Sequence, residues 1–195
     1  MISYTSEMRF RIEPARVLAR LARSAPSGSA EPPPGLESAI REVEAASEAR
    51  LARLHLPLQH LQGGVLSIGG YRVESAILSS RLQACSTCTI FMLTLGAAID
   101  RLLEGSSPAP SRQVLLDAVS SEAAEDCARW AQRAERAQAR REGRKALPRF
   151  SPGFGDFGLE HQGFFVDRLP GLGVSLTRGG MLLPRKTVTG VIGWA

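Results

Sequence analysis

The most informative stretch for the fold is Arg149-Phe150-Ser151-Pro152-Gly153-Phe154-Gly155-Asp156-Phe157-Gly158. Its three glycines and one proline exclude a long helix here and leave backbone N–H groups able to face a ligand. The guanidinium of Arg149 is planar and permanently charged, which suits a carboxylate or a phosphate. The three phenylalanines offer flat apolar faces. Two interpretations stay open: a cradle for a small zwitterion that carries an aromatic base, or a structural turn whose phenylalanines fill the core.

Upstream of this stretch, an alanine-rich segment from residue 112 to about 144 predicts the longest helix of the chain. The apolar face of this helix contains Leu115, Ala118 and Val119. Glu122 lies on the same face, because it follows these residues at helical spacing. A buried carboxylate without a partner is costly, so we expect either Arg149 or the amino group of a bound ligand beside Glu122. The alternative is a rotated helix in which Glu122 reaches solvent beside Glu125 and Asp126.

Helices and strands interleave along the rest of the chain without a strict βαβ order, which predicts an α+β fold. We expect strands or extended segments at 8–12, 55–61, 65–71, 84–95, 173–177 and 186–192, with a turn near 179–180 joining the last two. We expect further helices from Pro14 to about 21 and at 36–54, 74–82, 99–103 and 160–169. The segments 24–35 and 106–111 are rich in Ser, Pro and Gly and predict loops.

The size and composition of the chain predict one globular domain over residues 1–195, since domains run to roughly 100–200 residues. With 44% hydrophobic and 22% charged residues, the chain resembles ordinary soluble proteins. Its apolar run at 89–95 is far shorter than the roughly 20 residues of a membrane helix. Residues 1–7 lack the basic-then-apolar pattern of a signal peptide. We therefore expect a cytoplasmic protein that does not enter membranes.

Cys85-Ser86-Thr87-Cys88 has the CxxC spacing of redox and zinc sites. No second CxxC follows, and the three histidines show no finger-like spacing. The neighbouring residues are small or apolar, so we favour buried, unreactive thiols.

The net charge of +5 is concentrated near residues 129–145. A basic helix can contact nucleic acid or an acidic partner. Here Glu135 and Glu142 interrupt the cations, and cations are favourable near a helix C-terminus in any case. We favour a solvated helix end and expect no nucleic acid as a partner.

Several of these segments, taken together, resemble a known family. Residues 149–154 resemble the Arg-Pro-Ala-Pro-Gly-Tyr motif in the activation domain of vitamin B12 (cobalamin)-dependent methionine synthase. The resemblance continues, in the same order along the chain, through Thr94-Leu95-Gly96, the Glu122 helix, and residues 173–177, 181–184 and 188–190, as in stand-alone activation subunits. It covers about 65–194 best, whereas the N-terminal helical part, about 13–60, fits more loosely.

The resemblance implies a bent antiparallel β-sheet flanked by helices, with S-adenosylmethionine bound at the edge of the sheet. Carried over residue by residue, it assigns cofactor contacts to Glu122, Arg149, Ser151, Gly153 and Phe154. Phe154 takes the position of the motif tyrosine, and Arg178 stands where the family usually has an acidic residue.

The implied function is reactivation of the cobalamin of a methionine synthase or another corrinoid protein. A flavodoxin or ferredoxin-like donor supplies an electron, S-adenosylmethionine supplies a methyl group, and the chemistry occurs on the partner's corrinoid. Two alternatives stay open: a non-catalytic docking module for a corrinoid protein that does not bind S-adenosylmethionine, and a small redox enzyme that uses Cys85 and Cys88.

Overall fold

The computed structural model describes residues 1–6, 8, 10–24, 32–105 and 110–195. The strands are β1 (Ser3–Thr5), β2 (Arg50–His60), β3 (Val65–Ile68), β4 (Tyr71–Glu74), β5 (Thr87–Thr94), β6 (Ser175–Leu176), β7 (Leu182–Leu183) and β8 (Thr187–Trp194). The helices are α1 (Pro14–Ser24), α2 (Leu36–Ala46), α3 (Ala76–Arg81), α4 (Ala97–Gly105), α5 (Pro110–Arg141) and α6 (Gln162–Arg168), with 3₁₀ turns at Gln62–Gly64 and Leu159–His161.

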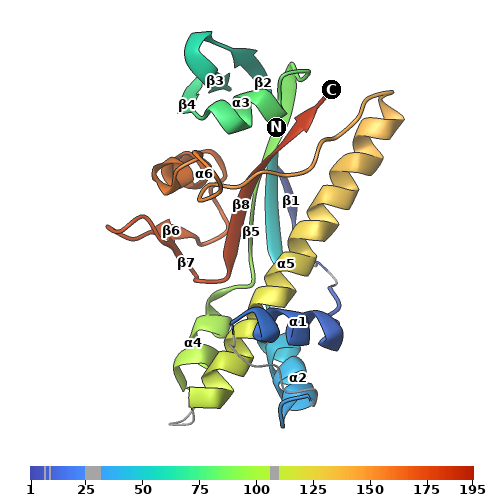
Figure 1. The fold of residues 1–195 in the computed structure, drawn as a ribbon, viewed down its shortest axis with the longest axis vertical. Helices are drawn as coiled ribbons and strands as arrows, with labels where there is room; N and C mark the ends of the chain where they lie inside the picture. The colour runs from blue at the N-terminus through green and yellow to red at the C-terminus, as the bar shows by residue number, and fades with distance from the viewer. Residues whose placement is uncertain (7, 9, 25–31, 106–109) are drawn as a thin grey trace.

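A curled antiparallel sheet forms the centre of the molecule, in the order β4-β3-β2-β5-β8, and β1 also pairs with β2 (Figure 1). The long strand β2 pairs with β5 from Arg50 opposite Thr94 to Pro57 opposite Thr87, and only its last residues pair with β3. The sheet is therefore shared between a main part and a small β3–β4 extension, which confirms the predicted α+β class.

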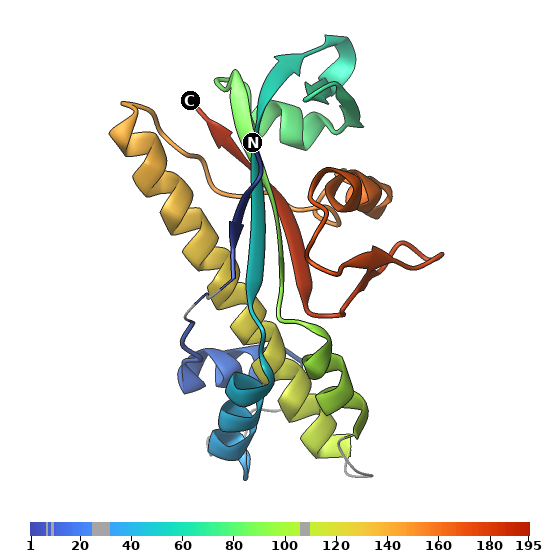
Figure 2. The ribbon, with the colours of Figure 1, turned by 180° about the vertical axis from the view of Figure 1, so that it is seen from behind.

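Each face of the sheet carries a hydrophobic core. On one face, Leu51, Phe91 and Leu93 pack with α5 and with α1, α2 and α4, which surround the N-terminal half of α5 (Figure 2). On the other face, Ile90 and Met92 pack with residues of α3 and α6. Because both faces of β5 are covered, its sequence is continuously apolar rather than alternating, which explains the predicted buried strand. In the described part of the chain, no helix has the length and apolar character needed to span a membrane.

The predicted helix at 36–54 is wrong in its second half. Helix α2 ends at Ala46, where Ser47 adopts an extended conformation and its hydroxyl donates to the carbonyl oxygen of Val43. The chain then forms β2, in which Leu51 and Ala52 are fully buried. Backbone pairing with β5 and burial on both faces outweigh the modest helix propensity of this segment.

Two predicted strands also differ from the structure. The described residues between 8 and 12 form no strand; Met8 and Ile12 are buried in the core, and the N-terminal strand is β1 instead. The segments at 173–177 and 186–192 do not pair with each other, because β6 turns back through Gly180 to pair with β7, whereas β8 pairs with β5. Most of the two predicted loops, residues 25–31 and 106–109, lies outside the described residues.

Candidate functional site

The segment that leads into the glycine-rich stretch is fixed against β8 and α5. Phe150 exchanges two backbone hydrogen bonds with Val191, of 2.9 and 2.8 Å. The buried side chain of Gln132 on α5 bonds to this segment twice, donating to the carbonyl oxygen of Leu147 at 2.9 Å and accepting from the backbone N–H of Arg149 at 2.5 Å. Arg149 therefore projects from a rigid position between the sheet and the long helix.

The glycine-rich stretch folds into a tight turn that uses its own backbone groups. The N–H of Gly153 donates to the carbonyl oxygen of Phe157 at 2.7 Å, and the N–H of Phe157 donates to that of Phe154 at 3.1 Å. Gly153 has a φ of +91°, a left-handed conformation that other residues rarely adopt. The prediction of free backbone donors is therefore wrong for Gly153 and Phe157.

A carboxylate of the turn holds it against α3. Asp156 accepts hydrogen bonds from the hydroxyl of Ser75 and from the backbone N–H groups of Ala76 and Ile77, at the start of that helix. The bond from Ser75 lowers the pKa of Asp156. Because the carboxylate satisfies N–H groups that no helical carbonyl can reach, it anchors the turn to a second element.

The three phenylalanines of the stretch have different environments. Phe150 and Phe157 are buried, with their rings nearly parallel at 6.2 Å, so they fill the core as in the structural interpretation. Phe154, in contrast, is 65% exposed. Only Phe154 thus presents a ring to a ligand or partner, while Ser151 lies half-buried with its hydroxyl close to Gly190 on β8.

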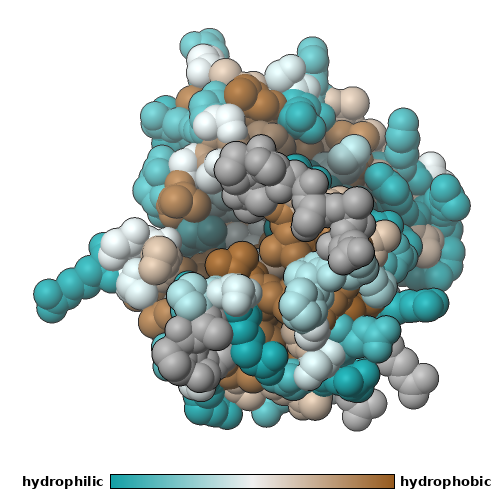
Figure 3. All heavy atoms as spheres, turned by 60° about the horizontal axis from the view of Figure 1, so that its bottom comes forward, coloured by the Kyte–Doolittle hydropathy of each residue, from teal (hydrophilic) through white to brown (hydrophobic). Residues whose placement is uncertain are grey.

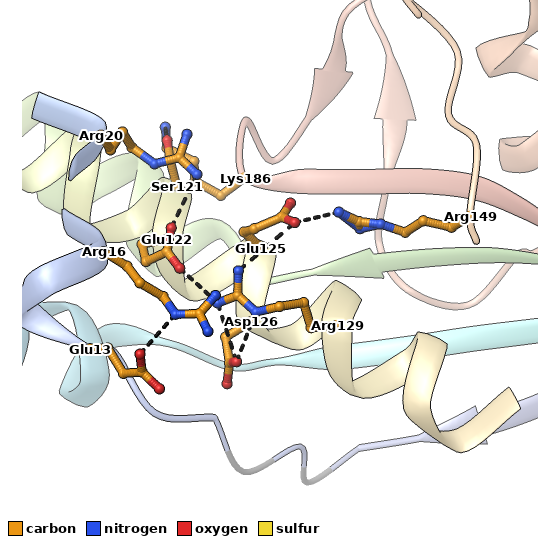
Figure 4. A network of polar contacts seen from close by, with 10 residues as sticks. All are labelled: Glu13, Arg16, Arg20, Ser121, Glu122, Glu125, Asp126, Arg129, Arg149 and Lys186. Atoms are coloured by element: carbon orange, nitrogen blue, oxygen red, sulfur yellow. Dashed lines mark hydrogen bonds and ion pairs between the residues drawn. The ribbon is translucent and has the colours of Figure 1, made fainter. Parts of the chain in front are cut away.

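Arg149 and Glu122 belong to one network of charged side chains around α5, but they do not contact each other (Figure 4). The Nη2 atom of Arg149 donates to Glu125. Arg129 links that carboxylate to the rest of the network: it lies 3.9 Å from Glu125, 3.3 Å from Asp126 and 2.7 Å from Glu122.

Glu122 is 4% exposed, so the predicted burial of this carboxylate on the apolar face is confirmed. Its partners are two arginines, Arg129 at 2.7 Å and Arg20 of α1 at 3.3 Å. The expectation of Arg149 as its partner is wrong, because Arg149 pairs with Glu125 one helical turn further along. Periodicity indicates Arg129, seven residues after Glu122 on the same helix, whereas nothing in the sequence indicates Arg20.

One donor of Arg149 remains without a partner. Its Nη1 atom is buried and makes no hydrogen bond to any described residue. Most buried polar groups are hydrogen-bonded, so an unpaired guanidinium nitrogen indicates a position for an acceptor. The site thus combines a half-occupied arginine fork, an adjacent carboxylate in Glu125 and an exposed phenylalanine ring.

A hollow of about 550 Å³ lies near the other end of this network, between α1, α4 and α5. Arg20, Asp117 and Ser121 are among its lining residues, whereas Glu122 and Arg149 do not line it. Figure 3 shows this end of the molecule, with apolar atoms visible between polar ones.

The cysteines contribute no reactive group to the site. Cys85, Cys88 and Cys127 are free and buried. Burial raises the pKa of Cys88 to about 12, which disfavours the thiolate. This agrees with the predicted buried thiols.

The charged residues after Arg129 are not all exposed. Arg133, Arg136, Arg140, Arg141 and Lys145 are exposed, as expected for a solvated helix end. Glu135, however, is buried rather than part of the exposed charge pattern.

Comparisons with known proteins show the fold. No protein-family model matches the chain, and no curated protein matches it. The chain is similar to a solved structure described as the MetH reactivation domain bound to AdoHcy, with a TM-score of 0.64 and 14% sequence identity. The match covers 99% of this chain and 78% of that one. At this identity the likeness shows the fold alone: an α+β domain with a curled antiparallel half-barrel sheet and helices, like that of the MetH reactivation domain.

Proposed function

We propose that this protein binds S-adenosylmethionine and supports reductive methylation of the cobalamin of a corrinoid-dependent methionine synthase. The solved structure that it resembles is named as bound to AdoHcy, the demethylated product of that cofactor. The observation that carries the proposal for this chain is the unpaired Nη1 of Arg149, buried next to the glycine-rich turn.

The chemistry of these residues fits a sulfonium amino acid. A ligand carboxylate would bind the fork of Arg149, which prefers two parallel hydrogen bonds. Ser151 and Gly153 would contact the ligand from the turn. The exposed ring of Phe154 would lie against the adenine or attract the sulfonium cation.

The ligand's ammonium group would lie near the carboxylates of α5. Glu122 is the contact that the family resemblance assigns, yet both of its oxygens accept from arginines. It would reach a ligand only if Arg20 or Arg129 gave up a bond. Glu125 is more exposed and already adjoins Arg149, so we add it to the proposed contacts.

In this proposal the bound cofactor supplies the methyl group, and the corrinoid belongs to a partner. A flavodoxin or ferredoxin-like protein would supply the electron. The chain itself would hold the methyl donor and dock on the corrinoid protein.

Isothermal titration with S-adenosylmethionine tests the proposal. We expect one site per chain and a loss of affinity of at least about tenfold in Arg149→Ala, because charge-assisted hydrogen bonds contribute about 1.5–3 kcal/mol each. Glu122→Gln and Glu125→Gln should also weaken binding. Arg140→Ala is the matched control, since Arg140 is an exposed arginine of α5 outside the network. No heat at millimolar ligand, with the corrinoid protein also present, would exclude the proposed binding.

A second candidate is a docking module for a corrinoid protein that does not bind S-adenosylmethionine. It is favoured by the pairing of Arg149 with Glu125 inside the chain and by the exposed Phe154. This candidate predicts that Phe154→Ala weakens binding to the corrinoid protein, while titration with the cofactor gives no heat in the native protein.

A further inference from the structure

A second cluster of polar side chains lies on the α5 face of the sheet, beyond the network around Glu122. Its centre is Glu135, which is 5% exposed although arginines surround it in the sequence. One carboxylate oxygen accepts from Nη1 of Arg53 on β2 at 2.9 Å, and the other accepts from the hydroxyl of Thr89 on β5 at 2.6 Å. The charge of this buried acid is thus balanced by one arginine.

The cluster fixes the orientation and tautomer of a histidine. His55 stands directly opposite Thr89 in the β2–β5 register, and its Nδ1 lies 3.3 Å from the threonine oxygen. The hydroxyl proton of Thr89 is used by Glu135, so the threonine oxygen accepts and Nδ1 donates. Burial lowers the pKa of His55, and this effect outweighs the opposing effect of Glu135. The neutral form of the ring is therefore favoured. Its Nε2 is then left as a hydrogen-bond acceptor.

A hollow of about 400 Å³ adjoins these residues, and Arg53, His55, Thr89, Glu135 and Trp194 are among those that line it. Its volume lies in the range of roughly 300–1,000 Å³ typical of small-molecule sites. The ring of His55 contacts that of Trp194 edge to face, with centroids 4.7 Å apart. The hollow therefore combines aromatic walls with a directed chain of polar groups.

Two donors that belong to residues lining this hollow have no partner. Nε of Arg53 and the indole Nε1 of Trp194 are both buried, and neither bonds to any residue that the structure describes. A buried donor without an acceptor costs free energy, so such groups are rare unless a ligand or water completes them. The two unpaired donors and the acceptor Nε2 of His55 belong to residues of the same lining. They indicate a ligand that accepts hydrogen bonds from the two donors and donates one to His55.

The charges of the lining indicate that this ligand is neutral. Arg53 is already neutralised by Glu135, and the carboxylate of Glu142 adds a negative charge to the lining. An anion would lie beside the carboxylates of Glu135 and Glu142, and a cation would leave the two donors unpaired.

We infer that this hollow is a second binding site, for a neutral molecule with a planar amide or lactam edge. Its carbonyl oxygen, which has two lone pairs, accepts from both Arg53 and Trp194, and its N–H donates to Nε2 of His55. Simple carboxamides and the lactam edges of nucleobases share this chemistry. Glu135, at the centre of this site, follows Glu125 by ten residues on α5. The inference is independent of the function proposed above.

The indole N–H signals of the ¹⁵N-labelled protein provide the test, because the chain has only two tryptophans. We expect nicotinamide or uracil to shift the Trp194 signal saturably, while the Trp130 signal stays in place as an internal control. Nicotinamide represents the carboxamides and uracil the lactams, so the tighter ligand identifies the source. Benzoate, which is flat but anionic and has no N–H, should cause no saturable shift.

Matched histidine variants test the direction of the hydrogen bonds. His55→Phe keeps a ring beside Trp194 but removes the acceptor, so affinity should fall about three- to tenfold, the effect of one neutral hydrogen bond. His60→Phe, on the same strand but outside the lining, should bind like the native protein. The inference is overturned if neither probe shifts Trp194, if benzoate acts like nicotinamide, or if His55→Phe binds as well as His60→Phe.

Discussion

Replacing Glu122 by glutamine should destabilise the protein by about 1–2 kcal/mol. Loss of one partner from a fully buried ion pair costs about 3–5 kcal/mol. Here the side chains of Arg20 and Arg129 are 32% and 25% exposed, so water would partly compensate them. The amide oxygen of glutamine can still accept from Arg129, but its NH₂ group would face the donors of Arg20. One of two charge-assisted bonds is therefore lost, so the expected loss of stability is about 1–2 kcal/mol rather than the about 3–5 kcal/mol of a fully buried pair.

Urea unfolding followed by circular dichroism measures this effect. For a chain of this size, each kcal/mol also corresponds to about 2–4 °C in the thermal midpoint. Glu37→Gln is the matched control, since its pair with Arg41 spans 4.0 Å between highly exposed side chains and should contribute little. If Glu122→Gln and Glu37→Gln unfold at the same urea concentration, Glu122 is not held as described, and the network is not a structural element.

Three further predictions concern other parts of the chain. Burial raises the pKa of Cys88 and of Cys127 to about 12, so a thiol reagent at pH 8 should label them only after denaturation; rapid labelling of the native protein would contradict this. Asp156→Asn should lower the thermal midpoint at pH 7, since it weakens the acceptor at the start of α3, and the difference should vanish in acid, as pH falls through the lowered pKa of Asp156. The pKa of His55 is lowered on folding, so the unfolded chain binds its proton first, and stability should fall as pH drops below about 6.5. Urea unfolding of His55→Phe at pH 8 and pH 5.5 should show a smaller loss than in the native protein, and an equal loss would refute the assignment.

The elements that could be predicted from the sequence are those whose local pattern agrees with their packing. The alanine-rich α5 and the continuously apolar β5 are examples, because helix propensity and burial favour the same structure. The first half of β2 could not be predicted, since Leu51 and Ala52 continue a helical pattern, and only pairing with β5, more than thirty residues away, makes them a strand. Strand pairing of this kind is a property of the tertiary structure.

The same distinction applies to the charged residues. Helical periodicity is sufficient to place Glu122 on the buried face of α5, and its burial then requires a cationic partner. It cannot select Arg20, which is 102 positions away on another helix. Glu135 lies on the buried face with Ala131 and Ala139, four residues to either side, but the arginines beside it make it resemble part of an exposed charge pattern. Its partners Arg53 and Thr89 could not be predicted, because they lie on two separate strands.

The position of Arg129 bears on how the proposed ligand would bind. A carboxylate that takes the fork of Arg149 must compete with Glu125, and an unpaired carboxylate near the core would make that exchange unfavourable. Arg129 lies 3.9 Å from Glu125, so Glu125 keeps a cationic neighbour when Arg149 is taken. An arriving ammonium group would pair with the same carboxylate. The exchange therefore replaces one opposite-charge contact, Arg149–Glu125, with two, and the unpaired Nη1 of Arg149 gains an acceptor, which is the net advantage that a zwitterion would obtain at this site.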